Sequence, residues 1–171
     1  AFVLALDDPP KNQRPDYGAL RQRVEEVVTT QPDGLETISQ TVYRPLTRRP
    51  AGVVVATKSA DNDLNRGRIQ LAVWTTAWHE RVRALCGSSR PRFVTLPLLL
   101  SGERRWDLYF ACDRGDDVGI EIVGPVDVGG TGDLLTLYAF LAVLRALAAW
   151  MDGPFKLWMM ELLDVGEEEA E

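Results

Sequence analysis

Cysteine and histidine are scarce in this chain, which has two cysteines and one histidine among its 171 residues. Cys86 and Cys112 lie far apart and form no CxxC pair, so the sequence argues against a zinc site built from cysteine and histidine. Both cysteines have apolar neighbours in sequence, which is typical of buried free thiols.

Uninterrupted apolar runs of the roughly 18 residues needed to cross a membrane are also missing. The longest candidate, 134–151, is interrupted by Arg145 and is predicted to be a buried core helix capped by Asp133. The chain opens on a strand-like apolar run and not on the basic segment of a signal peptide. These absences predict an intracellular protein, nuclear or cytoplasmic, with no membrane partner.

The net charge of −6 argues against a protein that coats nucleic acid nonspecifically. The acidic end, 164–171, is predicted to be a disordered tail. Arginines nevertheless crowd the middle of the chain, where they form either a local basic face suited to phosphate or a solvated arginine-rich surface. They are Arg44, Arg48, Arg49, Arg66, Arg68, Arg81, Arg83, Arg90, Arg92, Arg104 and Arg105.

Hydrophobic patterning predicts a single α/β domain over 1–163, with a mixed sheet of about five strands flanked by helices. The predicted strands or extended segments are 1–6, 37–43, 53–58, 93–101, 104–113 and 118–129. The predicted helices are 16–30, with Asp16 as its cap, 66–85 and 133–151, followed by a short helix or extended arm at 153–163.

The segment GVVVATKSADNDLNRGRIQLAVW, from Gly52 to Trp74, reads as a buried strand, a polar turn and a helix. Lys58 ends the strand, where a lysine is costly unless it has a partner or a function. Side chains two residues apart in a strand share a face, so Ala56 lies beside Lys58. An acid at position 56, with a second acid on a neighbouring strand, would hold Mg²⁺ or Mn²⁺ next to the lysine. Alanine supplies no such ligand.

The longer segment from Ile38 to Leu85 that contains this stretch, together with the later run from Leu96 to Trp150, resembles the fungal PD-(D/E)XK nuclease-like domain. Lys58 matches the motif lysine, and Gln70, Leu71 and Trp74 match the helix motif QLxxW. The resemblance runs from residue 1 to about 163 and lacks the family's N-terminal segment. It implies a restriction-endonuclease-like fold and Mg- or Mn-dependent phosphodiester hydrolysis in DNA or RNA, with Lys58 and Gln70 as catalytic residues.

By the same resemblance, Ala1 and Ala56 occupy the two acid positions that hold the metal. Natural degeneration and deliberate inactivation both explain two alanines. In either case we expect an inactive chain with no bound metal, whose Arg66 and Arg68 contact nucleic acid. The alternative function is a noncatalytic module of a larger protein that binds nucleic acid or another protein, the latter through the exposed edge of its sheet.

Several other residues are predicted to have structural roles. Trp74 and Trp78 are expected in the core, and Asp61 and Asp63 in a turn or helix cap. His79 is expected on the surface. The run DVGGTGD, 127–133, lacks the ending of a phosphate-binding loop and is predicted to be a flexible strand-to-helix connection.

Overall fold

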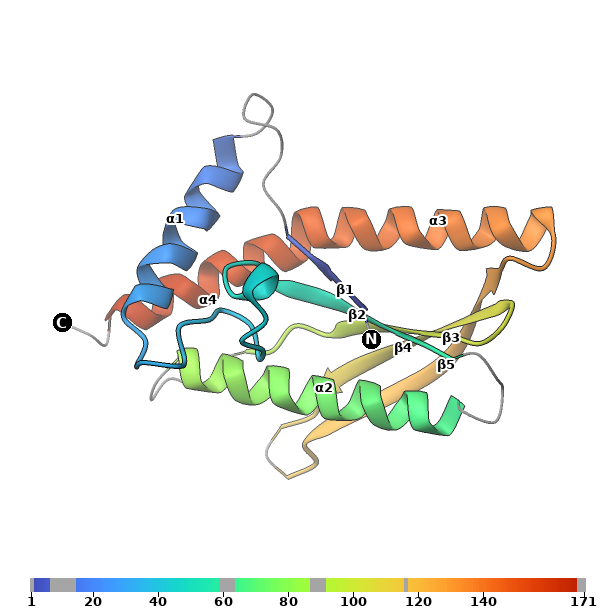
Figure 1. Ribbon diagram of the computed structural model, residues 1–171, viewed down its shortest axis with the longest axis horizontal. Helices are drawn as coiled ribbons and strands as arrows, with labels where there is room; N and C mark the ends of the chain where they lie inside the picture. The colour runs from blue at the N-terminus through green and yellow to red at the C-terminus, as the bar shows by residue number, and fades with distance from the viewer. Residues whose placement is uncertain (1, 7–14, 59–63, 87–91, 116, 169–171) are drawn as a thin grey trace.

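A mixed five-stranded sheet with helices on both sides forms the fold (Figure 1). The computed structural model describes residues 2–6, 15–58, 64–86, 92–115 and 117–168. The strand order follows the sequence: β1 (Phe2–Ala5), β2 (Ala51–Thr57), β3 (Leu96–Ser101), β4 (Arg105–Asp113) and β5 (Ile120–Gly130). Only β2 and β3 run parallel; the other neighbouring pairs are antiparallel. The predicted α/β class and the predicted number of strands are confirmed.

Helices connect and flank the strands. They are α1 (Pro15–Thr29), the short 3-10 helix η1 (Arg44–Leu46), α2 (Leu64–Leu85), α3 (Leu134–Trp150), the π-helical turn η3 (Met151–Phe155) and α4 (Lys156–Glu168). In Figure 1, α2 lies on one side of the strands and α3 on the other. The connection from β2 through α2 to β3 is the crossover that a parallel strand pair requires.

The centre of the core is the parallel pair β2 and β3. Val53, Val54, Leu98 and Leu99 are completely buried. Both faces of these strands are covered, which explains why their sequences are continuous apolar runs and do not alternate. The predicted strand at 53–58 is confirmed, although β2 begins two residues earlier and Lys58 follows its last residue.

Residues 37–43 do not form the predicted extended strand. The Thr37 hydroxyl donates a hydrogen bond to the Thr41 carbonyl (3.0 Å), and the Thr41 amide donates to the Ser39 hydroxyl (3.3 Å). Such side-chain bonds compete with strand pairing. Buried Arg81, on α2, also donates from Nε to the Thr37 carbonyl (2.9 Å). Arg81 therefore holds this loop and is no part of an exposed basic face.

The prediction that the apolar helix at 133–151 is buried is wrong. Asp133 does cap α3, accepting from the Thr136 amide (3.0 Å), but only Phe140 and Leu147 of α3 are buried. Leu134 and Leu135 are 67% and 80% exposed. By length and composition alone, the helical run Leu134–Asp164 is long and apolar enough to cross a membrane, even with Arg145. The sequence prediction that Arg145 excludes this is not confirmed. One such helix is weak evidence for a membrane span, because the core helix of a soluble protein passes the same test.

Two element ends differ from the sequence prediction. Helix α1 begins at Pro15, so Asp16 lies inside its first turn and not at the position before the helix. Helix α4 continues to Glu168, which extends regular structure into the segment predicted as a disordered tail. The predicted flexible connection at 127–133 is partly wrong, because 127–130 belong to β5. Gly129 and Gly130 are closely packed: Gly129, at φ +93°, has no room for a side chain against the carbonyl oxygen of Thr136.

His79 is completely buried, so its predicted surface position is wrong. Its Nδ1 lies 2.9 Å from the Thr75 carbonyl oxygen, and its ring centroid lies 4.4 Å from that of Phe93. Its Nε2 is buried with no hydrogen-bond partner among the described residues. Neighbouring Trp78, also buried as predicted, stacks on Trp158 of α4 at 5.4 Å. Burial lowers the pKa of His79, against a smaller opposing effect of the Thr75 carbonyl.

This burial predicts an acid-sensitive fold. With a folded-state pKa below the ordinary value of about 6.5, His79 binds a proton more readily in the unfolded chain. Its contribution to stability is therefore complete above about pH 6.5 and is lost as the pH falls below that value. Urea unfolding of the native chain and of His79→Phe at pH 7.5 and pH 5.5 should show a smaller loss of stability in the variant. An equal loss in both would contradict this expectation.

Candidate functional site

Lys58 and Gln70 meet at the end of β2. The Lys58 Nζ donates a hydrogen bond to the Gln70 side-chain oxygen (2.7 Å). The Lys58 amide donates to the Ser101 carbonyl (2.9 Å), which continues the pairing of β2 with β3 by one residue and fixes the lysine backbone. Two residues predicted as site residues, twelve apart in sequence, are thus joined directly.

A glycine on α2 allows this meeting. Gly67 is buried, and a Cβ added to it would collide with the Leu100 side chain of β3 and lie 3.4 Å from Cε and Cγ of Lys58. The helix therefore lies against the strand pair at this point, and the aliphatic part of Lys58 runs beneath it. Gln70 follows one turn later on the same helix. The sequence prediction overlooked Gly67, although a glycine in the first turn of a helix is a visible signal of close packing.

Ala56 occupies the same face of the sheet as this contact. It is completely buried and pairs with Leu100, which packs under Gly67. The row continues across β3 to Asp107 on β4. The side chain beside Lys58 is therefore a methyl group, and the first carboxylate along the row stands two strands away, about 10 Å.

An open groove of about 890 Å³ adjoins Gln70. Its walls come from β1, from the loop that ends in η1, and from one side of α2. The groove is lined by Val3, Gln40, Thr41, Tyr43, Leu46, Ile69, Gln70, Val73, Trp74 and Ala77. None of these residues is charged. Trp74, predicted in the core, is half-buried and contributes to the groove wall.

A sequence model of the PD-(D/E)XK nuclease superfamily matches residues 1–156. The chain belongs to this superfamily. No curated protein and no solved structure matches the chain significantly. The resemblance inferred from Lys58 and Gln70 is confirmed at the level of the superfamily, and the mixed sheet with its flanking helices is consistent with the restriction-endonuclease-like fold.

PD-(D/E)XK nucleases generally use divalent metals, and the described residues at the end of β2 do not fit one. Ala56 has no oxygen ligand, and Asp107 is engaged by Arg105, whose Nε lies 2.9 Å from its carboxylate. Among the described ranges, no three His, Cys, Asp or Glu side chains are grouped to hold a metal ion. Ala1, Asp61 and Asp63 lie outside those ranges.

The two arginines predicted to contact nucleic acid differ in their surroundings. The Arg68 Nε donates to the Tyr109 hydroxyl (3.0 Å), and its guanidinium carbon lies 5.7 Å from the Tyr109 ring centroid. Arg66 is exposed and has no hydrogen bond or ion pair with any described residue. Arg66 is exposed on α2, whereas Arg68 is held against β4. Tyr109, buried on a central strand, gave no sequence signal of this partnership.

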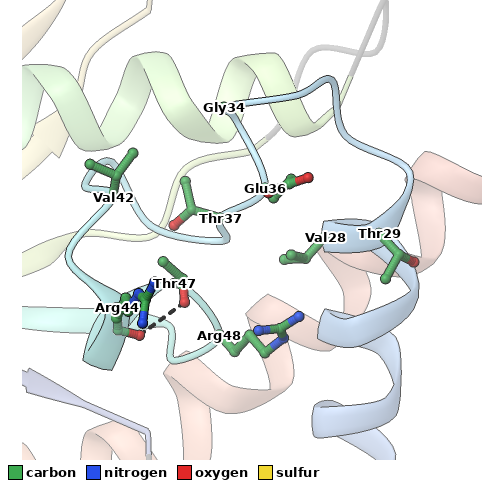
Figure 2. A pocket seen from close by; sticks show the side chains of 9 residues that line it. All are labelled: Val28, Thr29, Gly34, Glu36, Thr37, Val42, Arg44, Thr47 and Arg48. Carbon is green, nitrogen blue, oxygen red and sulfur yellow. Dashed lines mark hydrogen bonds between the residues drawn. The ribbon is translucent and has the colours of Figure 1, made fainter.

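A second cavity, of about 460 Å³, lies behind the loop that walls the groove. Figure 2 shows Arg44 and Arg48 reaching toward it, with the Thr47 hydroxyl bonded to the Arg44 carbonyl (2.9 Å). Glu36 also lines it, and the Arg48 Nε lies 2.6 Å from the Glu25 carboxylate. Opposite charges are therefore largely matched in this cavity, which makes it a weaker ligand site than the groove beside Gln70.

The close approach at Gly67 predicts opposite effects for two glycine-to-alanine changes in helices. Gly18 of α1 has no atom within 4 Å of an added Cβ, so Gly18→Ala should stabilise the fold by about 0.5–1 kcal/mol. Gly67→Ala should destabilise it by about 1–3 kcal/mol, because Leu100 and Lys58 must shift. Urea unfolding of both variants measures this difference; stabilisation by Gly67→Ala would show that α2 does not pack as described.

Proposed function

We propose that this chain is a PD-(D/E)XK domain that binds nucleic acid without hydrolysing it. The observation that carries the proposal is the Lys58–Gln70 hydrogen bond beside the methyl group of Ala56. The lysine and glutamine that match the family motif keep a shared position at the end of the motif strand. The carboxylate that would accompany them is replaced by a side chain without oxygen.

The charge around Lys58 supports an anionic ligand. The described cations at this end of β2 are Lys58, Arg66 and Arg68, and the described residues of 51–58 and 64–79 include no acid. Arg48 and Arg49 precede the opposite end of β2, and Arg48 pairs with Glu25. In sequence, Asp61 and Asp63 stand between Lys58 and α2. A local positive field of this kind attracts phosphodiesters even when the net charge is negative.

Binding without cleavage follows from the same residues. In metal-assisted hydrolysis, the ion lowers the pKa of the attacking water and stabilises the charge that develops on the phosphate. Lys58 can stabilise negative charge on a phosphate, but it cannot hold a divalent cation. A bound phosphodiester would therefore contact Lys58 and stay intact, whether the alanines arose naturally or by design.

A protein-binding module is the second candidate. Its support is the exposed apolar surface of the edge strand β5, where Val123 and Val126 are 42% and 50% exposed, and of α3, where Leu135 is 80% exposed. Apolar patches of this kind often mark protein interfaces. This surface lies away from Lys58, so the two functions are compatible.

Fluorescence anisotropy with labelled DNA and RNA oligonucleotides, at salt concentrations from about 50 to 200 mM, tests nucleic-acid binding. Three phosphate contacts predict an affinity that falls roughly 20- to 40-fold over this range. Lys58→Gln should lower the salt slope by about one. The matched control is Arg114→Gln. Arg114 follows the last residue of β4 and pairs with Glu121, so this change should leave the salt slope unchanged.

The same oligonucleotides, labelled at one end and incubated with Mg²⁺ or Mn²⁺, test the absence of cleavage. The proposal predicts intact strands. Metal-dependent cleavage that Lys58→Gln abolishes would refute the noncatalytic part of the proposal. Absence of binding at about 50 mM salt would refute the nucleic-acid part.

A further inference from the structure

We propose that the groove beside Gln70 binds an unstacked nucleobase, so that the chain recognises single-stranded nucleic acid with its phosphates at Lys58 and Arg66. This inference rests on the proposed nucleic-acid binding and adds the form of the ligand. It names a second subsite, for the base, next to the phosphate site at the end of β2.

The lining of the groove matches an uncharged, flat, largely apolar group. Tyr43 is 64% exposed on the loop side, and the half-buried Trp74 lines the α2 side of the groove. Ile69 and Val73, 63% and 64% exposed, extend the apolar wall along α2. Exposed aromatic rings are the platforms on which single-stranded binding proteins stack bases, regardless of base identity.

One amide of the groove matches the polar edge of a base. The exposed Gln70 side chain accepts from Lys58 through its oxygen, which leaves its NH₂ group to donate. Gln40 also lines the groove, but its side-chain oxygen is buried and is not open to a ligand there.

The cations stand where the phosphates of the same strand would lie. Lys58 is joined to the groove through Gln70. Arg66, exposed and without a partner among the described residues, precedes Ile69 and Gln70 by one turn and shares their side of α2. Positive charge therefore borders an uncharged groove. A nucleotide is complementary to this arrangement, because it joins a neutral base to an anionic phosphate.

This arrangement favours single strands over duplexes. In a duplex the base faces are stacked and their pairing edges are occupied, so none can enter a groove between a helix and a loop without first being extruded. In a single strand the bases can be splayed out at little cost. The groove volume of about 890 Å³ is within the range of pockets that enclose small organic groups.

The test compares the native chain with Tyr43→Ala on labelled oligonucleotides of about twelve nucleotides, within the site sizes of single-strand binders. The probes are oligo(dT), oligo(rU), an abasic strand with the same phosphates, and a duplex. Tyr43→Ala should weaken oligo(dT) or oligo(rU) binding roughly 5- to 100-fold without changing the salt slope. Tyr43→Phe, which keeps the ring, should bind as the native chain does. Arg66→Gln should weaken every probe and lower the salt slope by about one.

The abasic strand isolates the base subsite. The native chain should bind it more weakly than oligo(dT), by about the factor that Tyr43→Ala costs, whereas Tyr43→Ala should bind both strands equally. Equal binding of all probes by the native chain, with normal salt dependence, would overturn this inference and leave the proposed function standing. No binding of any probe would overturn both. The two homopolymers distinguish DNA from RNA as the preferred source of the base.

Discussion

The close packing of α2 on the parallel strands β2 and β3 is the constraint on which the site depends. Gly67 removes the one side chain that would keep the helix away from Leu100, and the stem of Lys58 fills the space beneath. This contact places Gln70 within 2.7 Å of the lysine ammonium and turns Ile69, Val73 and Trp74 toward the loop that ends in η1. The motif pair and the neighbouring groove are therefore products of the same helix placement.

The site has the lysine that matches the family motif, Lys58, and has no carboxylate at position 56, where Ala56 stands. In a metal-dependent nuclease, carboxylates hold the ion and the lysine assists it. Under the proposed function, the methyl group of Ala56 leaves Lys58 without a carboxylate neighbour at this position, and the lysine would contact a phosphate where a metal-dependent nuclease would hold an ion. An alanine fits the fold at this position, because Ala56 is completely buried beside Leu100.

The sequence predicted what depends on short-range pattern and motif spacing. The central strands, α2 and the cap at Asp133 could all be predicted from it, whereas the hydrogen bond between Lys58 and Gln70 could not. It failed where tertiary contacts decide. Residues 37–43 have strand-forming side chains, yet hydroxyl bonds and Arg81 bend them into a loop, and Arg81 gave no sign of burial. His79 looked polar, but the ring of Phe93, from a distant segment, and that of the adjacent Trp78 pack against it. Helix α3 is apolar enough for a core, and no described segment covers most of it.

Mn²⁺ calorimetry tests most directly whether a nuclease scaffold has lost only its metal ligands. The native chain is compared with Ala56→Glu and with the double variant Ala1→Asp/Ala56→Glu, after circular dichroism has shown that each is folded. We predict no measurable binding by the native chain and saturable binding by the double variant, with Lys58 supplying a counter-charge to the buried glutamate. Binding by the native chain as tight as by the double variant would contradict this account, and so would absence of binding by a folded double variant.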